Sequence, residues 1–314
     1  MSDFTTTIID KHTLSLIGNT PLVRLKRVAD EWGIADNVEI YGKCEFMNPG
    51  GSVKDRPALN IIETAEAQGT LTKDKILLDA TSGNTGIAYA MICALKGYKC
   101  QLCVPESASP ERKKILKAYG AELIFTPAAE SSDGAIRKAR ELYAQNPDKY
   151  FYADQYSNDA NWQAHFNTTG VELWEQTEGR ITHFIAAIGT SGSFIGTSRR
   201  LKSYNDKIQC IAVQPDVAIH GIEGIKHLES AMVPSIYDPK VPDHFIEVST
   251  ETAYHYTVKL PKTEGLLLGI SASANVYAAL KVAKALTDRN ESGVIVCILC
   301  DGGMKYLSEH FWNA

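Results

Sequence analysis

Three short segments of this sequence carry residues whose types and spacing could perform chemistry. The first, "NPGGSVKDRPALN" at residues 48–60, places Lys54 where a helix is expected to begin. The first turn of a helix carries a partial positive charge, so it disfavours an ammonium group and favours a neutral amine. A neutral amine can attack an aldehyde to form a Schiff base. The other reading of Lys54 is an ordinary solvated lysine in a capped turn.

The residues beside Lys54 predict how this helix starts. Ser52 and Asp55 have the S-x-x-D spacing of a capping box, and Pro57 suits a first helical turn. We therefore expect Ser52 and Asp55 to cap the helix and Lys54 to lie at its positive end. This position is expected to lower the pKa of the Lys54 amine.

The second segment, "DATSGNTGIAYA" at residues 79–90, lies between an apolar strand and a helix. Hydroxyl and amide side chains together with glycines at a helix start can bind a small anion such as a carboxylate. A simple turn and N-cap would explain one or two of these residues but not all six. They are Thr81, Ser82, Gly83, Asn84, Thr85 and Gly86.

The third segment, "FIAAIGTSGSFIGTSRR" at residues 184–200, is a strand followed by a glycine-rich turn and a helix. Backbone N–H groups and hydroxyls in such a turn suit a phosphate, although a plain glycine turn is the alternative. The segment lacks the Gly-Lys-Ser/Thr of a Walker loop and the G-x-G-x-x-G of a dinucleotide site, which disfavours a nucleotide-binding oxidoreductase. The candidate phosphate residues are Gly189, Thr190, Ser191, Gly192 and Ser193.

Taken together, the three segments predict one kind of enzyme. A reactive lysine, a carboxylate cradle and a phosphate cradle are what pyridoxal 5′-phosphate needs to act on an amino acid. No single segment would support this prediction alone.

The elements that must position these segments alternate regularly along the chain. Short apolar runs alternate with helical stretches, a pattern that predicts parallel sheets with helices on both faces. In such folds ligands bind beyond the carboxyl ends of the strands, where all three segments are expected. Strands are expected in residues 37–46, 75–80, 99–104, 121–126, 183–189, 208–213 and 293–300, and helices in residues 55–68, 85–96, 110–119, 133–145 and 276–287.

Composition excludes several classes of partner. The 314 residues are 44% hydrophobic, with a formal net charge of −5 and no run of Lys or Arg. This argues against binding to nucleic acid or to an anionic membrane surface. The N-terminus lacks the pattern of a signal peptide, and no apolar stretch approaches about 20 residues. We therefore expect a cytoplasmic protein.

The cysteines suggest a metal site, but the predicted strands argue against one. Two pairs have CxxC spacing, Cys100 with Cys103 and Cys297 with Cys300, both within apolar runs. Residues three apart in a strand point to opposite faces, so neither pair can easily bind one metal ion. The eight histidines form no metal-binding pattern. We expect buried structural thiols and no metal.

The same segments resemble one known family nearly end to end. "IGNTPLVRL", "NPGGSVKDR", "TSGNTG" and "GTSGSFIG" occur in the order typical of the cysteine synthase and cystathionine β-synthase group of fold-type-II pyridoxal-phosphate enzymes. The ending "LCDGGMKYLS" is more similar to the cysteine synthase B branch than to the A branch, which usually has a serine near Cys300.

The resemblance implies a role for each candidate residue. Lys54 would bind the cofactor, Asn84 would lie beside its 3′-oxygen, and Cys300 would face its ring nitrogen. The alternative for Cys300 is a structural cysteine in the core. Asp301 is expected to point to the opposite face if the strand continues. The implied carboxylate-binding residues are Thr81, Ser82, Thr85 and Gln155, and the implied phosphate-binding residues are Gly189, Thr190, Ser191, Gly192 and Ser193.

The resemblance also implies two residues in the wall of the site. Gly224 matches a glycine there, and Lys226 lies where B-type relatives often have an arginine. A solvated loop cation is the other reading of Lys226. In "GISASANVYAAL", Ala272, Ser273 and Asn275 replace small glycines of relatives, which is expected to reduce backbone freedom beside the cofactor.

The implied fold has two three-layer α/β domains, like the tryptophan synthase β-subunit, with the cofactor in the cleft between them. Residues 48–157 would form the smaller, movable domain, and residues 1–47 with 158–314 the larger one. The implied reaction is replacement of the β-substituent of an O-activated serine, O-acetylserine or O-phosphoserine, by a sulfur nucleophile to give L-cysteine. A homodimer is implied by the family alone.

Three alternatives remain at this stage. A cystathionine β-synthase or a sulfide-releasing cysteine β-lyase would share all three segments. A non-catalytic protein on the same scaffold is a different class of reading, which the intact Lys54 and Asn84 disfavour. The sequence does not name the leaving group or the sulfur source.

Overall fold

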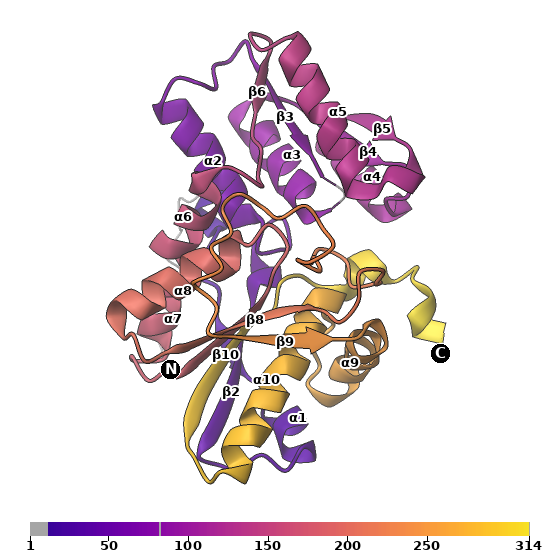
Figure 1. Cartoon of the computed structure of the whole chain (residues 1–314). Helices are drawn as coiled ribbons and strands as arrows, with labels where there is room; N and C mark the ends of the chain where they lie inside the picture. Colours follow the sequence, from indigo (N-terminus) through magenta and orange to yellow (C-terminus); the bar gives the residue numbers. More distant parts are fainter. Residues whose placement is uncertain (1–11, 82, 314) are drawn as a thin grey trace, which may run out of the picture.

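The computed structural model, which describes residues 12–81 and 83–313, contains two mainly parallel sheets in two lobes (Figure 1). The larger sheet has the strand order β1-β2-β10-β7-β8-β9, and the smaller one has the order β5-β4-β3-β6. All neighbouring strands are parallel except β1 and β2. The predicted fold class is confirmed. Within the described ranges, no helix is long and apolar enough to cross a membrane.

The elements follow the predicted alternation. The strands are β1 (Leu22–Arg24), β2 (Val38–Lys43), β3 (Ile76–Ala80), β4 (Lys99–Pro105), β5 (Glu122–Thr126), β6 (Tyr150–Tyr152), β7 (His183–Ala187), β8 (Gln209–Pro215), β9 (His244–Val248) and β10 (Gly293–Ile298). The α-helices are α1 (Lys26–Glu31), α2 (Asp55–Ala67), α3 (Asn84–Lys96), α4 (Pro110–Ala118), α5 (Ser131–Gln145), α6 (Asp159–Asn167), α7 (Thr169–Gln176), α8 (Gly192–Tyr204), α9 (Thr250–Thr263) and α10 (Ile270–Asp288). Short 3₁₀ helices are η1 (Thr13–Leu16), η2 (Glu45–Met47), η3 (Ala128–Glu130), η4 (Gly303–Tyr306) and η5 (His310–Asn313).

Both faces of the larger sheet are buried. On one face the apolar side chains pack with α1, α9 and α10, and on the other with α7 and α8. Neighbouring residues of β10 divide between the faces: Cys297 belongs to the first cluster and Val296 to the second. This explains why the strand reads as a continuous apolar run, as central parallel strands do.

The smaller sheet is built in the same way. Cys100 of β4 packs in the cluster formed with α2, α3 and α4, whereas Cys103 packs on the other face with α5. The two thiols therefore lie on opposite faces, as predicted. The part of the chain that is described contains no group of three or more His, Cys, Asp or Glu that could hold a metal ion.

Two predicted boundaries near the C-terminus are wrong. The helix expected to start at residue 276 begins at Ile270, so Ala272, Ser273 and Asn275 lie buried within α10 and do not form a turn. Because this part of the helix is buried on every side, its sequence does not show the apolar stripe of a helix with one exposed face. The last strand ends at Ile298, two residues before its predicted end.

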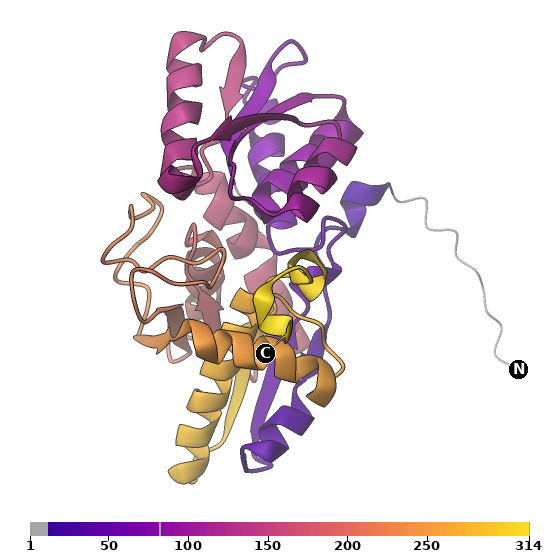
Figure 2. The same ribbon diagram turned by 90° about the vertical axis from the view of Figure 1, so that its right-hand side faces the viewer.

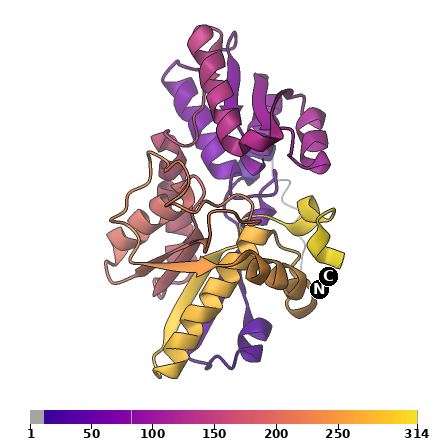
Figure 3. The same ribbon diagram turned by 45° about the vertical axis from the view of Figure 1, so that its right-hand side comes forward.

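Two segments of the larger lobe reach toward the smaller one (Figures 2 and 3). The C-terminal segment, residues 301–313, follows β10, and its Ser308 Oγ donates a hydrogen bond to Glu111 of α4 at 3.3 Å. The loop between β8 and β9, residues 216–243, carries Glu223, which forms an ion pair with Arg112 of α4. Both segments therefore contact the smaller lobe through polar side chains.

Candidate active site

The lysine loop, residues 48–54, joins η2 to α2, but the predicted capping box does not form. The helix begins at Asp55, so Lys54 itself is the N-cap residue. Ser52 Oγ accepts a hydrogen bond from the Lys54 N–H at 3.2 Å, while Asp55 Oδ2 accepts one from the Gly50 N–H at 2.5 Å. A Cβ on Gly50 would lie 2.5 Å from Asp55 Oδ1, so only glycine lets the loop fold back this far. Burial raises the pKa of Asp55 to about 7.

The Lys54 side chain is half-buried beside the end of β10. The Val53 N–H donates to the Cys300 carbonyl at 2.8 Å, and Ser52 pairs with Asp301 in an antiparallel bridge. Burial lowers the pKa of the Lys54 amine, and the nearby Cys300 and Asp301 oppose this shift. The direction agrees with the sequence prediction, but the main cause is burial and not the helix end.

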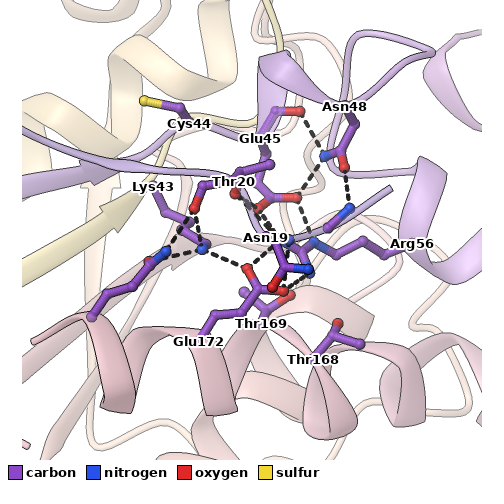
Figure 4. A network of polar contacts seen from close by, with 12 residues as sticks. Asn19, Thr20, Lys43, Cys44, Glu45, Asn48, Arg56, Thr168, Thr169 and Glu172 are labelled. Carbon is purple, nitrogen blue, oxygen red and sulfur yellow. Dashed lines mark hydrogen bonds and ion pairs between the residues drawn. The ribbon is translucent and has the colours of Figure 1, made fainter. Parts of the chain in front are cut away.

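A buried polar network lies behind the lysine loop, and the sequence did not predict it (Figure 4). Arg56 donates from Nε to Glu45 at 2.8 Å and from Nη1 to Glu172 at 2.6 Å. Lys43 Nζ donates to the second oxygen of Glu172 at 2.5 Å, and Thr20 Oγ1 donates to Glu45 at 2.7 Å. Two cations thus face two anions, which is how buried charges are tolerated.

This network holds the lysine loop at both ends. Asn48, its first residue, donates from Nδ2 to Glu45 at 2.9 Å and accepts the Gly18 N–H at 2.8 Å (Figure 4). Arg56 lies two residues after Lys54 and bonds to the same Glu45 carboxylate. The backbone that carries Lys54 is therefore fixed to a charged cluster on either side of it.

The predicted carboxylate cradle is ordered by bonds among its own members. Thr81 Oγ1 accepts the N–H groups of Gly83 and Gly86, both at 3.2 Å, at the start of α3. Thr85 Oγ1 donates to Gln155 Oε1 at 2.7 Å, which brings the two predicted residues together. Ser82 lies outside the described residues. The Gly86 N–H is used by Thr81, which leaves the N–H groups of Asn84 and Thr85 at the start of α3 for an anion.

The amide of Asn84 is held from both sides. Its Nδ2 donates to Asp301 Oδ2 at 2.8 Å, and its Oδ1 accepts from Lys305 Nζ at 2.7 Å. Lys305 was not singled out from the sequence, because nothing in the spacing of "GGMKYLS" relates it to residue 84.

The predicted phosphate residues form the turn before α8. Ser191, the N-cap residue, has φ of 71°, the left-handed region. A Cβ on Gly189 would lie 2.2 Å from the Gly224 carbonyl oxygen, and a Cβ on Gly192 would lie 1.9 Å from Asn161 Oδ1. Glycine is therefore required at both positions because backbone and side chains approach closely.

This turn leaves donors available for an anion. The first-turn N–H groups of α8 have no intrahelical acceptor. Ser191 Oγ is buried and has no hydrogen-bond partner within the described part of the chain. Thr190 Oγ1 accepts from Asn161 Nδ2 at 3.2 Å, and Ser193 is half-buried one residue into the helix. A buried, orphaned hydroxyl at a helix start fits a phosphate group.

The two predicted wall residues lie beside the same turn. Gly224 has φ of +83°, and two residues later the Lys226 N–H donates to the Ile188 carbonyl at 2.8 Å. The Lys226 ammonium lies 5.1 Å from the centre of the Tyr156 ring, next to Gln155 in the chain. Burial lowers the pKa of Lys226. Its half-buried position beside the other lobe differs from that of a freely solvated loop lysine.

Cys300 lies within reach of the lysine loop. Its Sγ accepts a hydrogen bond from Asn275 Nδ2 at 3.4 Å, so this residue of α10 orients the thiol. Burial raises the pKa of Cys300 to about 11, with Lys54 opposing the shift. The thiol is therefore neutral near pH 7.

Asp301 was expected to point to the opposite face only if the strand continued, and this condition is not met. The strand ends at Ile298, so the alternation of faces stops before residue 301. Asp301 is fully buried, and its Oδ2 accepts hydrogen bonds from Asn84 Nδ2 and from the Tyr306 hydroxyl, each at 2.8 Å. Asp301 therefore joins the start of α3 to the C-terminal segment.

Comparisons with known proteins find relatives over nearly the whole chain. The family described as "Pyridoxal-phosphate dependent enzyme" matches residues 13–301. The chain is 51% identical to a cysteine synthase of Aquifex aeolicus over 295 residues, covering 94% of this chain and 90% of that protein. It is 40% identical to cysteine synthase B of Escherichia coli over 301 residues, covering 94% and 96%. A crystal structure of the cysteine synthase of Entamoeba histolytica superposes with a TM-score of 0.93 at 36% identity, covering 100% and 94% of the two chains.

Proposed function

The chain belongs to the cysteine synthase family of pyridoxal-phosphate dependent enzymes, and from this membership we propose how its site works. The enzyme replaces the β-substituent of an O-activated serine with a sulfur nucleophile and so forms L-cysteine. The observation that carries the site assignment is the half-buried Lys54 amine beside Cys300 and Asp301.

The residues present fit pyridoxal 5′-phosphate at three points. We assign the covalent attachment to Lys54, the phosphate to the turn Gly189–Ser193 with its orphaned Ser191 hydroxyl, and the ring nitrogen to Cys300. When bound, the cofactor supplies an electron-withdrawing ring that acidifies the α-proton of an amino acid.

Lys54 serves two purposes in this assignment. Its amine would hold the cofactor, and as a free base it would accept the α-proton of the substrate. Burial supports this role because it raises the neutral fraction of the amine. The neutral Cys300 thiol is a poorer partner for a ring cation than a carboxylate, and this suits loss of a β-substituent more than transamination.

The substrate carboxylate is assigned to the start of α3. Thr81, Thr85 and Gln155 supply hydroxyl and amide groups there, together with first-turn N–H groups. Ser82, which lies outside the described residues, is assigned with them from its place in the sequence. The Thr85 hydroxyl donates to Gln155 in the structure. In this assignment, both side chains instead form hydrogen bonds to the substrate carboxylate. This grip orients the Cα–H bond toward Lys54.

Replacing Thr85 by valine separates substrate binding from cofactor binding. Loss of a hydrogen bond to a charged group costs about 1.5–3 kcal/mol, so the Kd for the amino acid should rise roughly 10- to 150-fold. Cofactor content should stay at the parent level. Ser193→Ala should do the reverse, with less bound cofactor at a given concentration. Absorbance titrations of the holoenzyme with the amino acid, and of the apoprotein with cofactor, measure both quantities. Equal loss of cofactor in both variants would refute this division of roles.

Lys226 is assigned to recognition of a doubly charged ligand such as thiosulfate or the phosphate of O-phosphoserine. A partly exposed lysine contributes on the order of 1 kcal/mol to such a ligand, and less at high salt. Lys226→Ala should therefore lower kcat/KM several-fold for these substrates and leave O-acetylserine with sulfide nearly unchanged. Lys240→Ala, at an exposed position in the same loop, is the matched control. A uniform fall for all substrates, or no change for any, would contradict this role.

We also propose that residues 48–157 form a smaller domain that closes over the substrate, that the enzyme is a homodimer and that it is cytoplasmic. The Arg112–Glu223 ion pair supports closure, because it already joins α4 to the loop that carries Gly224. Small-angle scattering with and without a bound amino acid measures closure and the number of subunits together. Location in the cell requires fractionation.

Steady-state assays distinguish this function from its rivals. O-acetylserine, O-phosphoserine, serine and cysteine are each paired with sulfide, thiosulfate and homocysteine. The proposal predicts that an O-activated serine with a simple sulfur donor gives the largest kcat/KM. A cystathionine β-synthase would instead prefer homocysteine, and a cysteine lyase would release sulfide from cysteine alone at the highest rate.

A further inference from the structure

Lys305 of η4 connects three parts of the site. Its Nζ donates to Asn84 Oδ1 at 2.7 Å, to the Gly51 carbonyl at 3.2 Å and to the Gly50 carbonyl at 3.4 Å. The C-terminal segment that carries it, yellow in Figure 2, lies between the two lobes. Lys305 thus binds the lysine loop and the start of α3 together.

These contacts are not those of an ordinary surface lysine. An ammonium group has three N–H donors and no acceptor, and all three oxygens around Lys305 Nζ are neutral. Burial lowers the pKa of Lys305, and the charges of Asp301 and Asp55 oppose this shift without an ion pair to Lys305 within the described ranges. The set of acceptors suits a group that fixes the geometry of its neighbours, because each donor is used on a different one.

The chemistry of the ammonium determines which way the Asn84 amide points. Because Lys305 can only donate, the Asn84 atom that it touches must be the carbonyl oxygen Oδ1. The Nδ2 group then faces Asp301 Oδ2 at 2.8 Å. Asp301 is held in turn by the Tyr306 hydroxyl at 2.8 Å. One N–H of Asn84 is thereby used, and the second remains for another acceptor.

We propose that Lys305 is a positioning residue that fixes the Asn84 amide, so that its second N–H is presented to the ring oxygen of the cofactor. This inference depends on the role assigned to Asn84 in the proposed function. Its bonds to the Gly50 and Gly51 carbonyls hold the ammonium beside that amide. Lys305 is assigned no contact with the cofactor and acts through Asn84.

A double-mutant cycle on cofactor binding tests this role. Apoproteins of the parent, Lys305→Met, Asn84→Ala and the double variant are titrated with pyridoxal 5′-phosphate, and the Kd and the visible absorbance maximum are recorded. Lys305→Met should raise the Kd several-fold and shift the maximum. In the Asn84→Ala background it should change the Kd by less than twofold, because its effect passes through Asn84. Lys305→Arg should restore most of the parent spectrum.

Lys262→Met is the matched control, since Lys262 is exposed in the last turn of α9. It should leave the Kd and the spectrum unchanged. Thermal unfolding shows whether each variant is folded. Lys305→Gln, which keeps an NH₂ group with two donors, replaces Lys305→Met if that variant does not fold. Failure of both to fold would overturn the proposal, because a positioning residue is not needed for the fold.

The remaining outcomes are distinct. A parent-like Kd and spectrum for Lys305→Met, or an equal effect of that change with and without Asn84, would overturn the positioning role. A parent-like result for Asn84→Ala would instead contradict the proposed role of Asn84 itself.

Discussion

Replacing Lys54 by alanine should lower kcat by several orders of magnitude while leaving a folded protein. One amine is assigned both the attachment of the cofactor and the removal of the α-proton, so its loss removes two functions at once. Among the described residues, the half-buried side chain makes no cap hydrogen bond at the start of α2. Cysteine formation by the purified variant, together with its circular dichroism spectrum, measures both parts of the prediction.

Lys262→Ala, at an exposed site, should keep the parent kcat. Turnover of Lys54→Ala within tenfold of the parent would contradict the assignment. An unfolded variant would show instead that Lys54 is needed for structure.

Replacing Arg56 by methionine should destabilise the protein by about 3–5 kcal/mol, because it leaves a buried charge without its partner. The Glu45 carboxylate is fully buried and receives two hydrogen bonds from Arg56, from Nε and from Nη2. Lys43 bonds instead to Glu172 and does not replace them. Unfolding by urea at pH 7 measures the change in free energy.

The exposed ion pair of Lys26 with Asp30 provides the control, since Lys26→Met should cost no more than about 1 kcal/mol. Equal losses from Arg56→Met and Lys26→Met would contradict the account of the network. The same network predicts a pH dependence. Hydrogen bonds and charge from Arg56 and Lys43 hold the pKa of Glu172 at about 2, below its ordinary 4.5. Its contribution is thus present above pH 4.5 and lost as the pH falls toward 2.

The sequence predicted the fold class and the loops that carry the chemistry because both depend on local patterns. Apolar runs, glycines and hydroxyls near a strand end can be recognised without knowing the partner. Thr85 and Gln155 were assigned to one site, and the structure places them 2.7 Å apart. The loops themselves are set by residues close together in the chain, whereas the pairing of Thr85 with Gln155, 70 residues apart, was implied by the family resemblance.

What the sequence did not reveal depends on contacts between distant segments. Arg56 and Glu172 are 116 residues apart, and Asn84 and Lys305 are 221 apart, so no spacing relates them. The position of Asp301 depended on where the strand ends, which alternation alone cannot fix to two residues. Ser52 and Asp55 have the spacing of a capping box, but the box does not form. Asp55 accepts the Gly50 N–H instead.

The central claim is that Lys54 carries pyridoxal 5′-phosphate in a cysteine-forming enzyme. Reducing the holoenzyme with borohydride fixes the cofactor to the amine that holds it, and mass spectrometry of a digest locates the modified residue. The account predicts modification of the peptide that contains Lys54, and a loss of this signal when a substrate amino acid is added before reduction. Modification of another lysine, or of none in an enzyme that retains cofactor absorbance, would contradict it.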